Sequence, residues 1–494
     1  MGDTTGTGRR TDPLQRERQP KAPGESDHLI VLRDGRAAHM GKGVTVIRGP
    51  QRQLAPDKVG PGPDEPTFLR ALSIKAGTAK AHRFQNLYGC LSESLLHHAW
   101  KSLNKRGAPG VDRVTIDQYA EHLDENIKQL VERLKRDEYR SRLIRRKYIP
   151  KGGGKERPLG IPVVEDRLLQ AAARHLLEAI YEQDFLPASY GYRPKVGAQQ
   201  AAGDLNRELQ FGRYGYVVEA DIQGFFDHID HDWLLRMLER RIDDRPFLGL
   251  IERWLKAGIL ERDGTILHPE SGTPQGGVIS PVLANIYLHY VLDLWFERRV
   301  KPDTEGQAYI IRFADDFVCA FQYRREAERF YREMPKRLAG FGLKVAPEKT
   351  RIHRFSRFHP SRTRRFTFLG FEFYWEADTK GTPRVWRRTS RKKLRGSLKA
   401  CKEWLKSHRH LPLPLLMGTV IRKVRGHHNY FRAIGNISSL WIFHREVVKL
   451  LYKWLNRRSQ RRSLTWDRLK GVLAAHSFPS AVDAMRGLRN RGLA

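Results

Sequence analysis

The 494-residue sequence predicts an α+β fold, in which a small antiparallel sheet packs on helices and a basic, all-helical segment follows. Two short apolar runs of strand length flank an acidic pair, Asp315 and Asp316, and a third such run ends on Asp221. Amphipathic spacing elsewhere predicts helices. We therefore expect three parts: a weakly ordered extension over 1–74, an α+β unit over 75–378, and a basic helical unit over 379–494.

The charge of the chain points to a polyanionic partner. The formal net charge is +35, and residues 380–494 hold 28 Lys and Arg against 4 Asp and Glu, a net +24. Such an excess favours nucleic acid over other partners. A membrane surface is the rival, but no apolar run reaches the roughly 18 residues of a spanning helix. Three widely separated cysteines predict neither a disulfide framework nor a zinc module, and they fit a reducing, cytoplasmic setting.

The elements follow in order from hydrophobic spacing. Residues 1–74 are rich in Gly, Pro and Arg, with one candidate strand at Val44–Ile47. A Gly-rich basic turn between two extended runs, 148–162, predicts a hairpin. Ser280 is expected to cap a helix in which Pro281 is the first residue. The apolar spacing predicts helices over about 91–103, 116–136, 165–181, 280–298, 324–338, 389–408, 416–431 and 440–458.

The adjacent carboxylates of Asp315 and Asp316 need an explanation, because like charges side by side raise each other's pKa. A divalent cation would neutralise them, and oxygen ligands suit Mg²⁺. Asp221 at the end of a neighbouring strand would supply a third carboxylate, and three can hold two Mg²⁺ ions for phosphoryl or nucleotidyl transfer. Taken alone, however, the pair is explained at least as well by a turn that is acidic without a function. His228 and His231 have ligand spacing, but no further clustered His or Cys supports a zinc site.

The motifs Asp221 with Phe225-Phe226 and Phe313-Ala314-Asp315-Asp316 resemble the palm of reverse transcriptases. The wider context resembles the group II intron-encoded kind. Phe313 stands where that family usually has Tyr, which keeps the ring and loses the hydroxyl. The resemblance implies a right-hand polymerase, with fingers and palm over 75–378 and a helical thumb, or maturase-specific, domain over 379–494. Further blocks in family order lie at 83–88, 107–112, 148–162, 189–194, 272–281, 342–350, 366–371 and 425–431.

The resemblance also implies roles for individual residues. Asp221, Asp315 and Asp316, with the main chain at Ile222, would bind two Mg²⁺, for which Mn²⁺ is a substitute. Phe226 would lie under the incoming sugar and exclude a 2′-hydroxyl, whereas Phe225 is expected in the core. Other nucleotide contacts would come from Lys151, Arg157, Gln275, Gly276 and Lys349. Contacts with RNA would come from Arg193, Arg391, Lys392, Arg422, Lys423, Arg425, Asn429, Arg457 and Arg458.

Several alternatives stay open. The hairpin at 148–162 is also explained by a solvated tip, Arg193 by a structural role, and Trp404, Trp441 and Trp454 by a helical core. The function that the resemblance implies is RNA-directed DNA polymerisation, with binding of structured intron RNA to assist splicing and retrohoming. Its partners would be intron RNA, an RNA template, a DNA primer or target and deoxynucleoside triphosphates, with a homodimer as one option. A splicing maturase with a silent polymerase, or a reverse transcriptase recruited to a cellular role such as defence, is the alternative.

Overall fold

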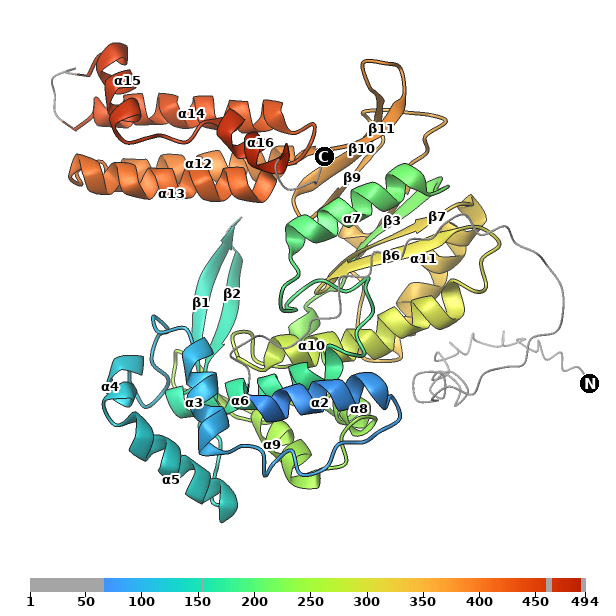
Figure 1. Cartoon of the computed structure of the whole chain (residues 1–494), viewed down its shortest axis with the longest axis vertical. Coiled ribbons are helices and arrows are strands. Elements are labelled where there is room, and N and C mark those ends of the chain that lie inside the picture. Colours follow the sequence, from blue (N-terminus) through green and yellow to red (C-terminus); the bar gives the residue numbers. More distant parts are fainter. Residues whose placement is uncertain (1–65, 153–154, 459–463, 490–494) are drawn as a thin grey trace, which may run out of the picture.

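The computed structural model describes residues 66–152, 155–458 and 464–489. Helices and three small sheets form a helical layer, a central sheet and a separate C-terminal bundle (Figure 1). The mixed helix-and-sheet class is confirmed. No helix in the described ranges is long and apolar enough to cross a membrane. The three cysteines are free thiols, as expected. The candidate strand at Val44–Ile47 lies outside the described residues.

The central sheet has four antiparallel strands in the order β6-β7-β3-β8. Apolar side chains fill both of its faces: Ile310 and Phe317 belong to one core cluster, and Ile311 and Val318 to another. Burial on both faces explains why β3, β6 and β7 read as largely continuous apolar runs instead of alternating ones. The strands are β3 (Tyr216–Asp221), β6 (Ala308–Phe313), β7 (Asp316–Phe321) and β8 (Arg351–Arg354).

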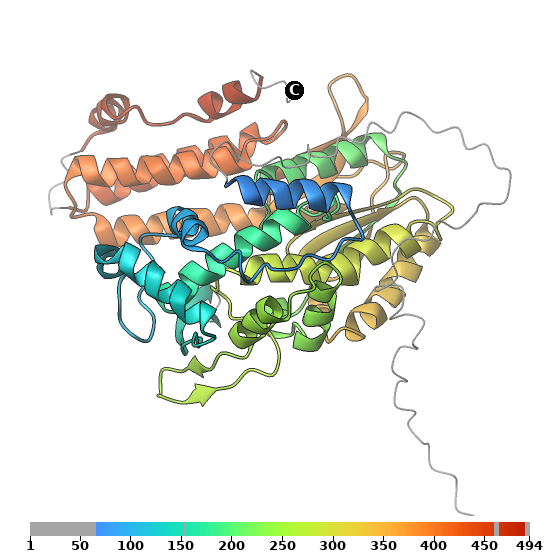
Figure 2. The ribbon, with the colours of Figure 1, turned by 60° about the horizontal axis from the view of Figure 1, so that its bottom comes forward.

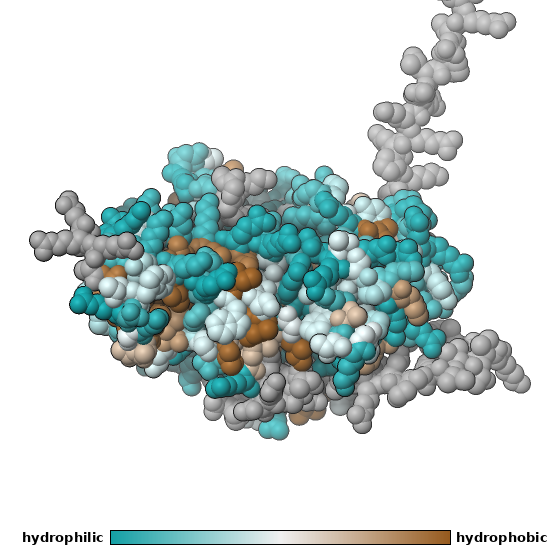
Figure 3. All heavy atoms as spheres, turned by 90° about the horizontal axis from the view of Figure 1, so that it is seen from above, coloured by the Kyte–Doolittle hydropathy of each residue, from teal (hydrophilic) through white to brown (hydrophobic). Residues whose placement is uncertain are grey.

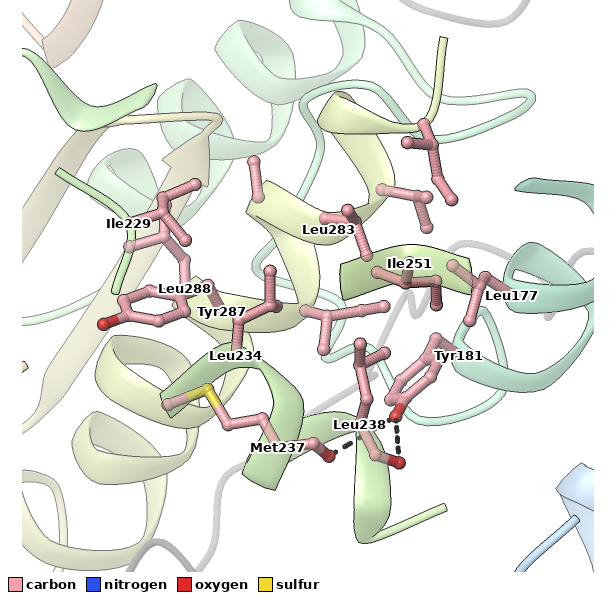
Figure 4. Packing of buried hydrophobic residues seen from close by; sticks show 14 of the residues in the cluster. Leu177, Tyr181, Ile229, Leu234, Met237, Leu238, Ile251, Leu283, Tyr287 and Leu288 are labelled. Atoms are coloured by element: carbon pink, nitrogen blue, oxygen red, sulfur yellow. Dashed lines mark hydrogen bonds between the residues drawn. The ribbon is translucent and has the colours of Figure 1, made fainter. Parts of the chain in front are cut away.

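Helices cover one face of this sheet and form the largest core. In Figure 4, Leu177 and Tyr181 of α6 meet side chains of α8, α9 and α10, and the Tyr181 hydroxyl donates to the carbonyls of Met237 and Leu238. The helices of this layer, including the short 3₁₀ helix η1, are α2 (Thr67–Thr78), α3 (Glu93–Ser102), α4 (Ile116–Glu121), α5 (Leu123–Lys135), α6 (Val164–Tyr181), η1 (Phe225–Asp227), α8 (His231–Glu239), α9 (Arg245–Leu255), α10 (Ser280–Leu288) and α11 (Arg324–Ala339).

A second sheet, β2-β1-β4-β5, extends from the helical layer. The predicted hairpin is present as β1 (Ile144–Gly152) and β2 (Lys155–Ile161), which pair antiparallel. It stands upright in Figure 1, on the side of the C-terminal bundle. The short pair β4 (Ile259–Leu260) and β5 (Ile266–Leu267) protrudes from the layer in Figure 2.

The third sheet, β11-β10-β9, joins the central sheet to the C-terminal bundle. Its core cluster holds Phe371 and Phe373 of this sheet with Val217 of the central sheet and Phe431 of the bundle. α7 (Ala198–Phe211) packs beside it. The remaining elements are η4 (Pro347–Lys349), β9 (Arg365–Phe368), β10 (Phe371–Ala377), β11 (Pro383–Thr389), α12 (Arg391–His408), α13 (Leu413–Phe431), α14 (Ile437–Leu455), α15 (Trp466–Ala475) and α16 (Ala481–Arg489).

Two expected boundaries differ from the structure. Residues 67–74, which we expected to be weakly ordered, begin α2, where Leu69 is buried and Ser73 accepts a hydrogen bond from Gln183. The boundary expected at 378/379 lies in the turn between β10 and β11, two paired strands of one sheet. The helical bundle therefore begins at Arg391, and a chain cut at 378 would lose a strand of the sheet.

Three local expectations are also corrected. The helix expected over 116–136 is two helices, because α4 ends at Glu121 and α5 begins at Leu123. Ser280 is the first residue of α10 instead of its cap, and its hydroxyl accepts from Thr273 and donates to the Pro274 carbonyl. The chain stays helical as far as Val300, through two π-helical turns, η2 (His289–Asp293) and η3 (Phe296–Val300).

Candidate active site

Strand pairing brings the three predicted carboxylates together at one end of the central sheet. Asp221, the last residue of β3, is the register partner of Asp316, the first residue of β7. Phe313 pairs with Asp316 across the β6–β7 hairpin, so that Ala314 and Asp315 form its two-residue turn. The turn is thus one residue earlier than the acidic pair itself. Ala314 takes the left-handed conformation at φ 57°, as such hairpin turns require.

The electrostatics of the three carboxylates favour a cation. Burial raises the pKa of Asp316 to about 7, with further contributions from Asp221, Glu219 and Asp315. Burial also raises the pKa of Asp315, and Asp221 adds to that increase. Burial and the neighbouring carboxylates thus disfavour the ionised forms of Asp315 and Asp316, and a divalent cation would favour those forms.

Lys349 of η4 contacts one of these carboxylates directly. Its ammonium group donates to Asp221 Oδ2, and this hydrogen bond raises the pKa of Lys349. In the described residues, no three His, Cys, Asp or Glu side chains already lie in an arrangement that could hold a metal ion. The carboxylates still fit Mg²⁺ by ligand chemistry and by charge, although the ammonium group of Lys349 occupies Asp221 Oδ2. The main chain at Ile222 follows Asp221 directly, and its role as a ligand stays a prediction.

Two aromatic rings lie beside the carboxylates. Phe225 is buried in the core, as expected, and Phe226 is half-buried. Both belong to the 3₁₀ turn η1, not to a strand. The edge of the Tyr192 ring packs against Phe226, with centroids 6.2 Å apart. Burial raises the pKa of Tyr192, and the nearby Asp315 contributes to the increase while Arg157 opposes it. Tyr192 thus lies near both Asp315 and Arg157 of the β1–β2 hairpin.

The Pro274–Gly276 segment connects this hairpin to the site. The Gln275 carbonyl accepts from the Gly160 N–H of β2 at 2.6 Å. Gly276 has φ 113°, and a Cβ there would lie 2.6 Å from the Gly160 carbonyl oxygen, so only glycine fits this approach. Arg157 of β2 is exposed. The Lys151 side chain lies outside the described part of the chain, and its role stays a prediction.

The expected contact of Arg193 with RNA needs correction. Its side chain is 6% exposed and forms an ion pair with the equally buried Glu182 at 2.9 Å. It also donates to the carbonyls of Leu186 and Ser189. All of this holds the segment before Tyr192 in place, so the structural alternative is right and template contact is wrong. The neighbour that faces the site is Tyr192, which sequence reasoning missed, although it stands in the same motif.

The two histidines each use one ring nitrogen for a main-chain contact. His228 Nδ1 lies 2.8 Å from the Gly224 carbonyl, and His231 Nε2 lies 2.6 Å from the Gly272 carbonyl. These contacts give both side chains a structural role beside η1.

The expected RNA-contact residues of the C-terminal bundle are all exposed. On α13, Arg422, Arg425 and Asn429 follow a spacing of three and four residues and share one face. Among the described residues, none of the seven basic side chains forms an ion pair with Asp or Glu. The eight exposed side chains are Arg391, Lys392, Arg422, Lys423, Arg425, Asn429, Arg457 and Arg458.

Known proteins resemble the chain over the segment that carries this site. The family described as reverse transcriptase (RNA-dependent DNA polymerase) matches residues 149–373. Protein YkfC of Escherichia coli K12 is 31% identical over 350 residues, which cover 64% of this chain and 90% of YkfC. The chain belongs to the reverse transcriptase family.

Other relatives of the chain are intron-encoded proteins and an intron maturase. The group II intron-encoded protein LtrA of Lactococcus lactis subsp. cremoris is 40% identical over 228 residues, 45% of this chain. Nuclear intron maturase 1 of Arabidopsis thaliana, a mitochondrial protein, is 30% identical over 95 residues, 19% of this chain and 13% of that protein. The match spans only 37% of the length of LtrA.

Gly191 allows the loop before Tyr192 to approach the carboxylate hairpin. A methyl group on Gly191 would overlap the main-chain nitrogen of Ala314 and lie 2.9 Å from the Phe313 carbonyl carbon. We expect Gly191→Ala to destabilise the protein by about 1–3 kcal/mol, as overpacking does, and to lower its melting temperature. The control is Gly197→Ala, because nothing lies within 4 Å of a Cβ there. Equal melting temperatures for the two variants would contradict the close approach.

Proposed function

We propose that the chain is an RNA-directed DNA polymerase that uses two divalent cations for nucleotidyl transfer. The observation that carries the proposal is the convergence of Asp221, Asp315 and Asp316 at one end of a rigid sheet, opposite a basic hairpin. Carboxylates at the ends of paired strands, and in the tight turn that joins two of them, are held more precisely than carboxylates on long loops, as the chemistry requires. Membership of the reverse transcriptase family supports the same reaction.

Each residue of the site takes a role that fits its position. Bound at the carboxylate oxygens, Mg²⁺ supplies the acidification of the primer 3′-hydroxyl and the neutralisation of the triphosphate. Arg157 on the hairpin, with Lys151, grips the triphosphate, since guanidinium and ammonium groups both bind phosphate oxygens. Lys349 releases Asp221 and contacts the same phosphates. Phe226 lies against the sugar, and Gln275 and Gly276 lie against the base.

Primer extension by the purified full chain tests this proposal. A DNA primer on a mixed-sequence RNA template is incubated with Mg²⁺ and the four deoxynucleoside triphosphates. We expect full-length product that disappears when EDTA removes the ions. A chain that binds the primer–template but adds no nucleotide would favour the alternative, a splicing maturase with a silent polymerase.

The exposed basic residues of α12–α14 support a second part of the proposal, the binding of structured intron RNA. Figure 3 views the side of the molecule that carries this bundle, and its surface is largely hydrophilic with hydrophobic residues in between. Exposed cations without carboxylate partners can bind phosphates at little cost. The intron-encoded and maturase relatives favour an intron RNA over other polyanions. Help in splicing and retrohoming, with DNA as primer, belongs to the same proposal.

Neutralising two arginines of α13 tests the RNA surface. We expect Arg422→Gln with Arg425→Gln to make the negative slope of log affinity against log salt shallower by about 1.4–1.8, because the variant contacts two fewer phosphates and releases fewer counterions. The measurement is RNA binding over a series of salt concentrations. The matched control is Arg324→Gln with Arg325→Gln on α11, which removes the same charge from side chains that pair with Glu328 and Glu305. Equal slopes for the two double variants would contradict the surface.

A further inference from the structure

Arg312 is a fully buried charge directly before the carboxylate hairpin turn. It is the penultimate residue of β6, and both its side chain and that of Asp293 in η2 are 0% exposed. Its guanidinium binds both Asp293 oxygens, through Nε at 2.7 Å and Nη2 at 2.6 Å. Such a bidentate pair fixes the plane of the guanidinium as well as its position.

The remaining donors of Arg312 reach three other groups. Nη1 donates at 3.1 Å to the Asn285 side chain and at 3.1 Å to the carbonyl of Ala314. Nη2 donates to the Ser189 hydroxyl at 2.7 Å. The Ala314 carbonyl belongs to the peptide bond that joins Ala314 to Asp315. One buried guanidinium thus connects α10, η2 and the 189 loop to the peptide that carries the Asp315 carboxylate.

The turn needs such support from outside. Ala314 has φ 57°, a conformation that side chains other than glycine rarely adopt unless their surroundings impose it. The main chain of Arg312 also pairs with the 188–190 segment, receiving from Tyr190 at 2.9 Å and donating to Ala188 at 2.8 Å. Asn285 closes the network by donating to the Gly191 carbonyl at 2.6 Å.

We propose that Arg312 is a positioning residue for divalent-cation binding. Through the Ala314 carbonyl it holds the hairpin turn, so that the Asp315 carboxylate keeps its place beside Asp221 and Asp316. This inference rests on the proposed function. An ion pair with Asp293 that served folding alone would not need the hydrogen bond from Arg312 to the Ala314 carbonyl. Cation binding does need the turn to be held in place, because a small displacement of the Asp315 carboxylate would be costly to catalysis. Lysine would keep the charge near Asp293, but its single ammonium group cannot reproduce the fork that reaches Ala314.

The test compares Arg312→Lys with Arg241→Lys. Arg241 is also buried, its side chain being 4% exposed, and it pairs with Asp184 at 2.9 Å. Its other contacts are carbonyls at the end of α2, away from the carboxylates. Four quantities are measured for the full chain: the Mn²⁺ affinity without nucleotide, from a paramagnetic signal, kcat and KM for a deoxynucleotide, and the melting temperature.

We expect Arg312→Lys to weaken Mn²⁺ binding about tenfold and to lower kcat by about 10- to 100-fold, with little change in KM. Arg241→Lys should lower the melting temperature without changing Mn²⁺ affinity. Equal Mn²⁺ affinities in the two variants would overturn the inference.

Ser189→Ala provides a gentler second variant if Arg312→Lys does not fold. It removes one acceptor of the guanidinium and should weaken Mn²⁺ binding severalfold, and an unchanged affinity would overturn the inference. The two proposals fail in distinguishable ways. A wild-type chain that binds Mn²⁺ but extends no primer would refute the polymerase, while the variants still decide the role of Arg312. A wild-type chain that binds no Mn²⁺ at these carboxylates would overturn both.

Discussion

The Asp315→Ala protein is expected to lose primer extension by at least about 10³-fold. Removing a carboxylate that binds the cations forfeits several kcal/mol of transition-state stabilisation, and each 1.36 kcal/mol is a factor of ten in rate. RNA affinity should persist, because it comes mainly from phosphate contacts with basic residues elsewhere. The measurement is the rate of primer extension alongside RNA binding for the same preparation.

A matched control for this variant is Asp124→Ala. Asp124 lies in α5 with its side chain 92% exposed, so the same substitution leaves the carboxylate site intact. Near wild-type extension by Asp315→Ala would show that the metal assignment is wrong. Splicing assistance that persists in Asp315→Ala would show that the two activities are separable.

Phe226→Ala is expected to raise ribonucleotide incorporation relative to deoxynucleotide incorporation by about 10²-fold. The half-buried ring, braced by Tyr192 on one side and Phe225 on the other, would exclude the 2′-hydroxyl by its volume. A clash of a few kcal/mol corresponds to a ratio of this size. The measurement is the ratio of kcat/KM for a matched ribo- and deoxynucleotide pair.

Phe225→Leu serves as the control for sugar selectivity. Phe225 is 1% exposed in the core, so its truncation should lower stability and leave the nucleotide ratio unchanged. The two rings are neighbours on a 3₁₀ turn, and they differ in burial, because Phe225 is buried and Phe226 is half-buried. A larger change of the ratio in Phe225→Leu than in Phe226→Ala would show that Phe225, and not Phe226, contacts the sugar.

Three strands of the central sheet, β3, β6 and β7, could be predicted because their apolar runs are buried on both faces and adjoin acidic residues, whereas β8 has no such run. The sequence could not predict that Asp221 lies opposite Asp316, since that register joins strands far apart in the chain and is fixed by the whole sheet. The turn was expected at Asp315-Asp316 and lies one residue earlier, at Ala314-Asp315, because nothing in the composition of Ala-Asp-Asp indicates which residue adopts a positive φ.

Buried ion pairs account for what the sequence could not show near the site. Contact of Arg193 with RNA was expected from the resemblance of its motif, with a structural role as the alternative, and Glu182 pairs with this side chain below the surface. The ion pair of Arg312 could not be predicted from the sequence. Arg312 stands inside an apolar strand, and its buried partner Asp293 belongs to a helical segment whose hydrophobic periodicity gives no sign that it packs against the hairpin. Trp441 was expected in the core of the bundle and is 47% exposed, whereas Trp454 is buried as expected.

The most direct test of the account is single-nucleotide addition to a DNA primer on an RNA template, with each template base offered each deoxynucleotide in turn. If the three carboxylates at the end of the central sheet and the basic hairpin form a template-directed polymerase site, only the complementary deoxynucleotide should be added at an appreciable rate. The addition should need Mg²⁺ and should vanish in Asp315→Ala. Addition that ignores the template base, or that persists in Asp315→Ala, would contradict the account.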